Sequence, residues 1–180
     1  MRGVESVLEF AEVETPLGRM QLTVRDGAIC TLGWELAADP RAEPGAAEAA
    51  ARVTGYFAGD LRAFAGARFD AGGTEFQRVV WAQLLTIEPG ETRSYGQLAK
   101  AIGRPAASRA VGAANGANPI AIAVPCHRVI GASGALTGYG SGLPRKRWLL
   151  DHEGTPSRMA LSSARRSRSS VSGLMSVTRR

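Results

Sequence analysis

The sequence predicts an α+β protein built in two parts, and three observations indicate this. Short segments of alternating polarity, separated by turn residues, follow one another near the N-terminus. From residue 74 the pattern changes to helical spacing with two capping boxes. The stretch Ala71-Gly-Gly73 lies between the two patterns. We therefore predict a structural α+β domain over 1–73, a mostly helical domain over 74–154 and a basic tail over 155–180.

Composition limits the class of protein. The 180 residues are enough for one domain or two small ones, and 44% of them are hydrophobic, as in globular proteins. No run reaches transmembrane length and the N-terminus has no signal-peptide core, so we expect a cytoplasmic protein with no membrane partner. Two Cys and two His without paired spacing argue against a zinc site, and in a reducing compartment Cys30 and Cys126 should stay free thiols.

The charge is distributed unevenly. Residues 1–90 hold 8 Lys and Arg against 13 Asp and Glu, a net −5; residues 91–154 hold 8 against 3, a net +5; residues 155–180 hold 6 Arg and no acid. The whole chain carries +6. A basic second half suits a polyanionic partner, although a solvated basic face with a tail would give the same numbers.

The N-terminal part reads as a meander of three strands followed by a helix. Strands are predicted at 8–14, 20–24 and 28–34, a loop at 37–45, and a helix at 46–57 that closes near Gly59; 61–69 is ambiguous. Asp26, Asp60 and Asp70 have no spacing that requires a shared site. We therefore expect no catalytic constellation here.

The helical part begins at two capping boxes. Thr74 with Gln77 starts a helix that should end at Pro89-Gly90, and Ser94 with Gln97 starts a short helix closed by Gly103. A third helix is predicted over 106–114. Two short helices joined by a tight turn form a helix-turn-helix candidate, although such hairpins also occur in proteins that bind no DNA.

The third helix consists almost entirely of small residues, with Arg109 as its one long side chain. Small residues allow a helix backbone to approach a partner closely. That partner is either another helix, packed tightly, or DNA, with Arg109 projecting into the duplex. The sequence leaves both interpretations open.

The centre of the chain is the segment from Ile120 to Ile130. An apolar run over 120–124 predicts a short buried strand, which Pro125 ends. Cys126, His127 and Arg128 follow directly, and a base beside a thiol with a cation beyond it makes the thiolate accessible. We interpret this as a nucleophilic cysteine; the alternative is a core cysteine beside a surface histidine.

The remaining segments are a glycine-rich loop, a helix and the tail. The loop over 131–142 brings backbone N–H groups against a ligand, or is a flexible surface loop. A helix from Arg145 to Leu150 should turn its basic residues outward and Trp148, Leu149 and Leu150 to the core. The Ser/Arg-rich tail lacks an apolar period and is predicted to be disordered.

These motifs, in this order, resemble those of the O6-alkylguanine-DNA alkyltransferases over residues 74–154. The matching segments are Ser94-Tyr-Gly-Gln-Leu-Ala99, Arg109-Ala-Val-Gly112, Asn118-Pro119, Pro125-Cys-His-Arg128 with Val129-Ile-Gly131, Thr137-Gly-Tyr139 through Gly142, and Trp148 through Gly154. The first 70 residues match only in outline and lack the cysteine cluster of zinc-binding variants.

The resemblance implies a fold and an activity. The fold would be a ribonuclease H-like N-terminal domain and a winged-helix-like C-terminal domain. The activity would be DNA repair: a methyltransferase flips O6-alkylguanine, or less readily O4-alkylthymine, out of duplex DNA and moves the alkyl group irreversibly to Cys126. A thioether does not hydrolyse, so each chain would act once and need no cofactor. The partner would be double-stranded DNA carrying alkylated guanine, bound by a monomer, with cooperativity along DNA left open.

The resemblance also assigns catalytic roles to residues. Cys126 would be the nucleophile, His127 its base through a water molecule, and Glu153 the group that orients His127. Asn118 would hold the turn before the cysteine. The Tyr95 hydroxyl would donate to N3 of guanine.

Two further sets complete the predicted site. The base pocket would comprise Tyr95, Val129, Tyr139, Gly140 and Ser141, with the Gly140 N–H meeting O6. The DNA contacts would comprise Ser94, Ala107, Ser108, Arg109 and Arg128, with Arg109 filling the gap left by the flipped base in the minor groove. Ser141 and Ala121 stand where relatives often have Gly and Pro.

Two rival functions use the same residues. A sensor of alkylated bases resembles this family but replaces the cysteine, whereas Cys126 is present here. A cysteine hydrolase would use Cys126, His127 and Glu153 but would need an oxyanion hole and turnover. Turnover on an ester or peptide would distinguish it from a stoichiometric transferase.

Overall fold

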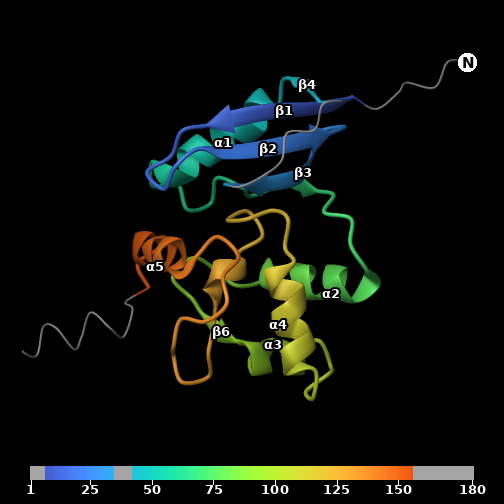
Figure 1. Ribbon diagram of the computed structural model, residues 1–180, viewed down its shortest axis with the longest axis vertical. Coiled ribbons are helices and arrows are strands. Elements are labelled where there is room, and N and C mark those ends of the chain that lie inside the picture. Colours follow the sequence, from blue (N-terminus) through green and yellow to red (C-terminus); the bar gives the residue numbers. More distant parts are fainter. Residues whose placement is uncertain (1–6, 35–41, 156–180) are drawn as a thin grey trace, which may run out of the picture.

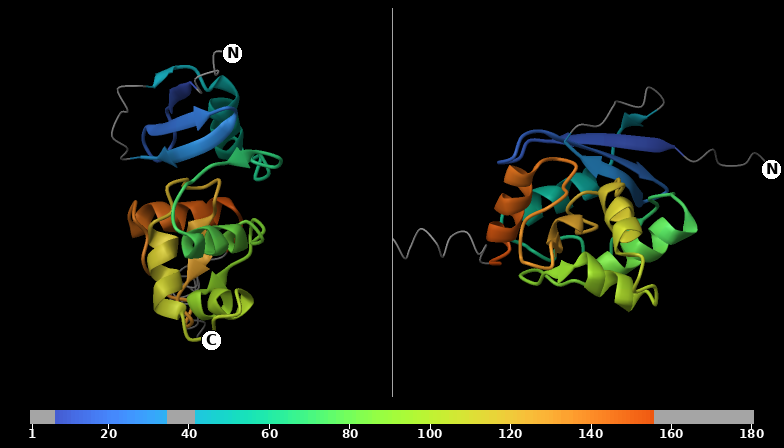
Figure 2. Two further views of the ribbon diagram at one scale, coloured as in Figure 1. Left: turned by 90° about the vertical axis from the view of Figure 1, so that its right-hand side faces the viewer. Right: turned by 60° about the horizontal axis from the view of Figure 1, so that its bottom comes forward.

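The computed structural model describes residues 7–34 and 42–155, which form a mixed α/β fold. A five-stranded sheet with strand order β4-β1-β2-β3-β5 forms one layer, and helices α2 to α5 gather on one side of it (Figure 1). The two further views show the same arrangement, with the sheet as one layer and helices α2 to α5 as the other (Figure 2). From residue 156 onward the predicted tail lies outside the described residues.

The predicted meander is confirmed. Strands β1 (Leu8–Val13), β2 (Met20–Arg25) and β3 (Ala28–Gly33) pair antiparallel in sequence order. Asp26 and Gly27 join β2 to β3 with positive φ at both positions, the combination that a tight hairpin turn requires. Two-residue strands close the edges: β4 (Glu43–Pro44) lies parallel to β1, and β5 (Arg68–Phe69) parallel to β3.

Helix α1 (Ala47–Phe57) confirms the helix expected at 46–57. Its buried residues Ala49, Val53 and Tyr56 recur every three or four positions and therefore lie on one face. The buried face includes a tyrosine, whose hydroxyl requires a partner in the interior. That partner lies in the candidate site described below.

Both capping boxes are confirmed. In α2 (Glu75–Leu84) and α3 (Tyr95–Ala101), the Thr74 and Ser94 hydroxyls accept from the third helical N–H, and Gln77 and Gln97 accept from the cap N–H. Helix α2 ends at Leu84, earlier than the predicted end at Pro89-Gly90. The chain turns directly after Leu84, and the Ile87 N–H donates to Leu84 O at 3.0 Å. Helix α4 (Ser108–Gly116) starts two residues later than predicted and packs against α2 and α3.

The expected buried strand at 120–124 is wrong, although the segment is buried. Only Ile120 pairs with the sheet, through a bridge to Leu32, and the chain then turns. Ile122 has a φ of 69° and Val124 N–H donates back to Ile120 O at 3.0 Å. An apolar run reports burial and not backbone conformation, so the sequence could not distinguish a buried turn from a buried strand.

The last helix, α5 (Leu143–His152), confirms one expectation and corrects another. Leu149 and Leu150 are buried as predicted, and Trp148 packs against the core from the edge. Lys146, expected to point outward, is fully buried. Its ammonium group finds acceptors inside the protein, and these are described with the site.

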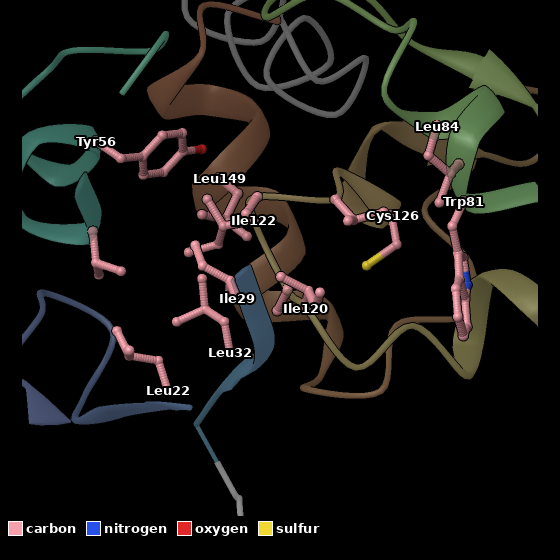
Figure 3. Packing of buried hydrophobic residues seen from close by; sticks show 14 of the residues in the cluster. Leu22, Ile29, Leu32, Tyr56, Trp81, Leu84, Ile120, Ile122, Cys126 and Leu149 are labelled. Atoms are coloured by element: carbon pink, nitrogen blue, oxygen red, sulfur yellow. The ribbon is translucent and has the colours of Figure 1, made fainter. Parts of the chain in front are cut away.

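One continuous core joins the sheet to the helices. Ile29 and Leu32 of β3 meet Ile120 and Ile122 of the buried turn, with Leu149 of α5 beside them (Figure 3). The predicted division at residues 73 and 74 remains a prediction. Among the described residues, no helix is long and apolar enough to cross a membrane.

The crossing between the two parts gives a test of packing. A Cβ on Gly73 would lie 2.6 Å from the Trp81 ring, whereas a Cβ on Gly72 would meet nothing within 4 Å, and both residues have positive φ. Gly72→Ala should lower the free energy of unfolding by about 1 kcal/mol through backbone strain alone. Gly73→Ala should lower it by a further 1–3 kcal/mol or so, because Trp81 must move. Urea unfolding measures both; equal losses would contradict the steric argument.

Candidate active site

Cys126 opens a single 3-10 turn, η1 (Cys126–Arg128), and is 6% exposed. Its N–H donates to Val124 O at 2.8 Å, which ties η1 to the buried turn before it. In Figure 3 its side chain lies between Ile120 and the α2 residues Leu84 and Trp81. The thiol therefore sits in an apolar setting at the junction of the turn and α2.

His127 is fully buried and its ring has a defined proton arrangement. Nε2 lies 2.9 Å from Glu153 Oε1. An ionised carboxylate only accepts, so Nε2 carries the proton and Nδ1 presents its lone pair. Nδ1 is buried and has no hydrogen-bond partner within the described part of the chain. The ring is thus a neutral base whose free lone pair is Nδ1.

The Glu153 carboxylate, at the C-terminal end of α5, is the most heavily bonded group of the site. Oε1 accepts from Tyr56 Oη at 2.7 Å, His127 Nε2 at 2.9 Å and Arg128 Nη2 at 2.8 Å. Oε2 accepts from Arg128 Nε at 2.8 Å. Burial alone would raise the pKa of Glu153, but the hydrogen bonds from His127 and Arg128 and the charge of Arg128 hold it well below its usual range. The carboxylate therefore stays ionised.

Arg128 lies in the interior, not on the surface where a DNA contact was expected. It is 7% exposed, forks onto both oxygens of Glu153 and also donates to Ile87 O. This two-pronged contact fixes the carboxylate plane and compensates its charge. The sequence pattern located this arginine beside the cysteine but gave no information about its direction.

The titration of the thiol and the imidazole differs from the expectation of a readily formed thiolate. Burial raises the pKa of Cys126, and the Asn118 side chain and the Lys146 charge lower it by less. Burial also lowers the pKa of His127, against the opposing effect of Glu153. A neutral thiol and a neutral imidazole are therefore the resting forms, and the thiolate forms only when a base takes its proton.

Two asparagines hold the backbone around the cysteine. Asn118 Nδ2 donates to Val124 O at 2.8 Å and to Ile120 O at 3.3 Å, and its Oδ1 accepts from Ile120 N–H at 3.1 Å. These bonds close the buried turn from within. Asn115 in α4, which the sequence analysis did not single out, donates from Nδ2 to Cys126 O at 3.4 Å.

Lys146 is a second group that the sequence analysis missed. Its Nζ donates to Val129 O at 2.5 Å and Thr137 O at 2.6 Å, and so joins η1 to the glycine-rich loop. Desolvation lowers its pKa to about 8, against the attraction of Cys126. The available signal was composition: Lys146 is one of two lysines in a chain whose other cations are arginines.

The glycine-rich loop packs over the same region. Tyr95 Oη donates to Thr137 O at 3.2 Å, and a Cβ on Gly138 would approach that hydroxyl to 3.3 Å. Burial raises the pKa of Tyr139, whose hydroxyl has no partner among the described residues. Gly140 and Ser141 follow Tyr139, and Gly140 is exposed. Tyr95 and Tyr139 both lie near enough to Cys126 to interact with it electrostatically.

The other predicted DNA contacts lie at two helix starts. Ser94 caps α3, and its hydroxyl oxygen accepts from the Gln97 N–H at 3.2 Å. Ala107 and Ser108 are partly exposed at the start of α4, and Arg109 beside them is exposed. The helices α3 and α4 are in contact. Among the described residues, no group of three or more His, Cys, Asp or Glu could hold a metal ion.

Comparison with known proteins identifies relatives of this arrangement. Residues 75–155 match the family model of the 6-O-methylguanine DNA methyltransferase DNA-binding domain. A methylated-DNA–protein-cysteine methyltransferase of Mycolicibacterium paratuberculosis is 51% identical over 156 residues, covering 80% of this chain and 91% of that protein. The Mycobacterium tuberculosis H37Rv protein of the same name is 48% identical over 154 residues, covering 82% and 93%.

Solved structures give the same result. The crystal structure of Mycobacterium tuberculosis OGT in complex with DNA matches with a TM-score of 0.76 and 45% identity, covering 86% of this chain and 99% of that chain. The O6-methylguanine-DNA methyltransferase of Pyrococcus kodakaraensis, 24% identical with a TM-score of 0.63, shares the fold.

The buried ion pair of the site predicts a large effect on stability. Glu153→Gln leaves the Arg128 charge without its counter-ion and should lower the free energy of unfolding by about 3–5 kcal/mol. Since folding lowers the pKa of Glu153, this contribution is present above the ordinary glutamate pKa and is lost as the pH falls below it. Denaturant unfolding at pH 7 and pH 4 should show the variant closing part of its gap to the parent at the lower pH.

A matched control removes a carboxylate of an exposed ion pair. Glu88 lies 3.3 Å from Arg62, and both side chains are more than half exposed. Glu88→Gln should change the free energy of unfolding by less than about 0.5 kcal/mol. Similar losses in the two variants would contradict the role given to the buried pair.

Proposed function

The chain belongs to the methylated-DNA–protein-cysteine methyltransferases, and from this premise we propose that it repairs O6-alkylguanine in duplex DNA by moving the alkyl group onto Cys126. The single observation that carries the assignment of residues is the buried series Cys126, His127 and Glu153, in which a thiol adjoins an imidazole held by an ionised carboxylate. This is the arrangement of nucleophile, base and orienting acid.

The proposed transfer balances as one displacement. His127 takes the thiol proton through a water molecule, using the Nδ1 lone pair that the Glu153 bond leaves free. The sulfur forms a bond to the alkyl carbon as the bond from that carbon to O6 breaks, and the electron pair of the broken bond passes to guanine. The guanine takes up one proton overall, equal to the one that the thiol lost. Because the thioether is stable, one chain repairs one base.

The pocket roles are proposed from the loop contacts. Tyr95 would exchange its bond to Thr137 O for one to N3 of guanine, which favours departure of the purine anion. The Gly140 N–H would meet O6, with Ser141 beside it and Tyr139 forming a wall. The carbonyls of Cys126 and Val129 would accept from the guanine amino group. Val129 O takes a bond from Lys146, and a carbonyl oxygen has a second lone pair. Cys126 O accepts from the Val129 N–H and, at 3.4 Å, from Asn115 Nδ2, and the amino group would replace the long Asn115 bond.

The DNA contacts are proposed from helix α4. A helix of small residues lets its backbone enter the minor groove closely, and the exposed Arg109 side chain would fill the gap in the stack. Ser94, Ala107 and Ser108 would contact the backbone near the flipped nucleotide. We assign Arg128 to the Glu153 carboxylate in place of a direct DNA contact, because it is buried there.

The finer description of the fold belongs to the same proposal. The meander with α1 would be a ribonuclease H-like unit, and α3 with α4 the helix-turn-helix of a winged-helix-like unit. The protein would act in the cytoplasm, since its substrate is DNA, and as a monomer in solution.

The first test is mass spectrometry after incubation with a duplex carrying one O6-methylguanine. We expect one added methyl group per chain, found on the Cys126 peptide and limited to one however much DNA is supplied. Cys126→Ser should show no adduct, and Cys30→Ser, which changes the one other cysteine, should react as the parent does. Tight binding without an adduct would indicate a sensor, and turnover on an ester would indicate a hydrolase.

The second test separates flipping from chemistry. Arg109→Ala should slow repair of duplex DNA by about 10- to 100-fold, because the gap left by the flipped base is no longer filled. Reaction with the free O6-alkylguanine base, which needs no flipping, should change less than about twofold. Single-turnover rates with both substrates give the comparison, and an equal loss with both would refute the role of Arg109.

A further inference from the structure

A tyrosine of the N-terminal part reaches the centre of the site. Tyr56 on α1 is 1% exposed and donates from Oη to Glu153 Oε1 at 2.7 Å, across 97 positions of sequence. Figure 3 shows its ring directed from α1 toward the α5 side of the core. It was absent from the predicted site, which lay wholly within residues 94–153. A buried phenol hydroxyl needs a hydrogen-bond acceptor, and here that acceptor is a carboxylate oxygen of the candidate site.

Tyr56 and His127 donate to the same carboxylate oxygen, Glu153 Oε1. Oε1 accepts from the phenol, from the His127 Nε2–H and from Arg128 Nη2, whereas Oε2 accepts from Arg128 Nε. Donors on one oxygen share its negative charge, so each weakens the bond of the others. A weaker bond from His127 to the carboxylate lowers the attraction of the ring for a second proton. The Tyr56 hydroxyl thus acts on His127 without touching it.

On the proposed function, we propose that Tyr56 is a positioning residue for the transfer: through Glu153 it keeps His127 neutral and its Nδ1 lone pair free for the thiol proton. A histidine that is already protonated cannot act as a base. The alkyl transfer therefore depends on the N-terminal part of the chain through one hydrogen bond.

The other charged groups around His127 set the background of this effect. Glu153, at the end of α5, raises the proton affinity of His127, and Arg128 on η1 and Lys146 on α5 lower it. Cys126 adjoins it in sequence, and Tyr139 of the glycine-rich loop interacts with both Cys126 and Glu153. Burial, followed by the charge and hydrogen bond of Glu153, raises the pKa of Tyr56 far above its ordinary value, so the phenol remains a donor throughout the working range. Tyr56 and the neutral His127 ring thus share Oε1 with the charged Arg128.

The test compares two substitutions that act in opposite directions. Tyr56→Phe keeps the ring and removes the donor; 3-fluorotyrosine incorporated at position 56 keeps the shape and is a more acidic, stronger donor. We expect the pKa of His127 to rise by about 0.5 to 1 in Tyr56→Phe and to fall with fluorotyrosine. NMR of labelled histidine measures this directly, since the chain has two histidines and His152→Gln identifies the other signal.

The rate of transfer should follow the same shift. For Tyr56→Phe the acid limb of the pH profile should move to higher pH. The rate at a pH below both His127 pKa values should then fall roughly three- to tenfold, while the rate at pH 8.5 changes less than about twofold. With fluorotyrosine the acid limb should move downward. The control is Val53→Ala, a buried position on the same face of α1, which should lower the melting temperature and leave the pH profile unchanged.

Every outcome of these measurements either supports or overturns the proposed role of Tyr56. Opposite shifts with the two substitutions support the proposal. An unmoved acid limb with either folded variant overturns it, as does an equal shift with Val53→Ala, which would make the effect one of packing. Failure of the parent protein to form the Cys126 adduct would refute the proposed function instead, and the His127 pKa would still measure the effect of Tyr56. Should Tyr56→Phe not fold, the fluorotyrosine chain decides alone.

Discussion

The structure of the site depends on one requirement, that the buried Glu153 carboxylate be fully compensated. An ionised carboxylate in the interior costs several kcal/mol unless charge and hydrogen bonds replace the lost water. Arg128 supplies the charge, and His127 and Tyr56 supply further donors. Because these groups come from α5, η1 and α1, the carboxylate can be buried as a compensated ion only when all three elements have docked. Assembly of the site therefore requires the N-terminal helix as well as the C-terminal elements.

The resting state that follows is chemically quiet. Burial raises the pKa of the Cys126 thiol and lowers that of the His127 ring, so both are neutral. A protein that reacts once and is then spent gains from this, because a thiolate exposed to water would be consumed by other electrophiles and oxidants. Burial keeps the nucleophile latent, and its proton must then be moved at the moment of reaction, by a base whose lone pair is free. Lys146, with its lowered pKa and its attraction to the sulfur, is placed to favour the anion as it forms.

The sequence was informative where local rules decide the structure and silent where long-range contacts do. Turn residues at Asp26-Gly27 and capping boxes at Thr74 and Ser94 act within a few residues, and the strands and helix starts they imply are present. The apolar run Ile120–Val124 predicted burial but not the turn at Ile122, whose φ is positive. Asn118, which lies outside the run, stabilises that turn by its bond to Val124 O. The directions of Lys146 and Arg128 depend on acceptors 9 to 41 positions away, and basic residues normally face water. Tyr56 was missed for the same reason: its partner is 97 positions distant.

The same contrast explains why the N-terminal part is more than a support. The motifs of the family lie in the second half of the chain, which favours the view that the first part merely stabilises the second. Yet the sheet bonds the buried turn through Leu32 and Pro119, and α1 bonds the Glu153 carboxylate through Tyr56. A single hydroxyl can matter at this point, since one donor on a shared oxygen alters the proton affinity of its neighbour. The lack of a catalytic motif in residues 1–73 is thus compatible with a direct chemical contribution, and that contribution has to be sought in contacts and not in motifs.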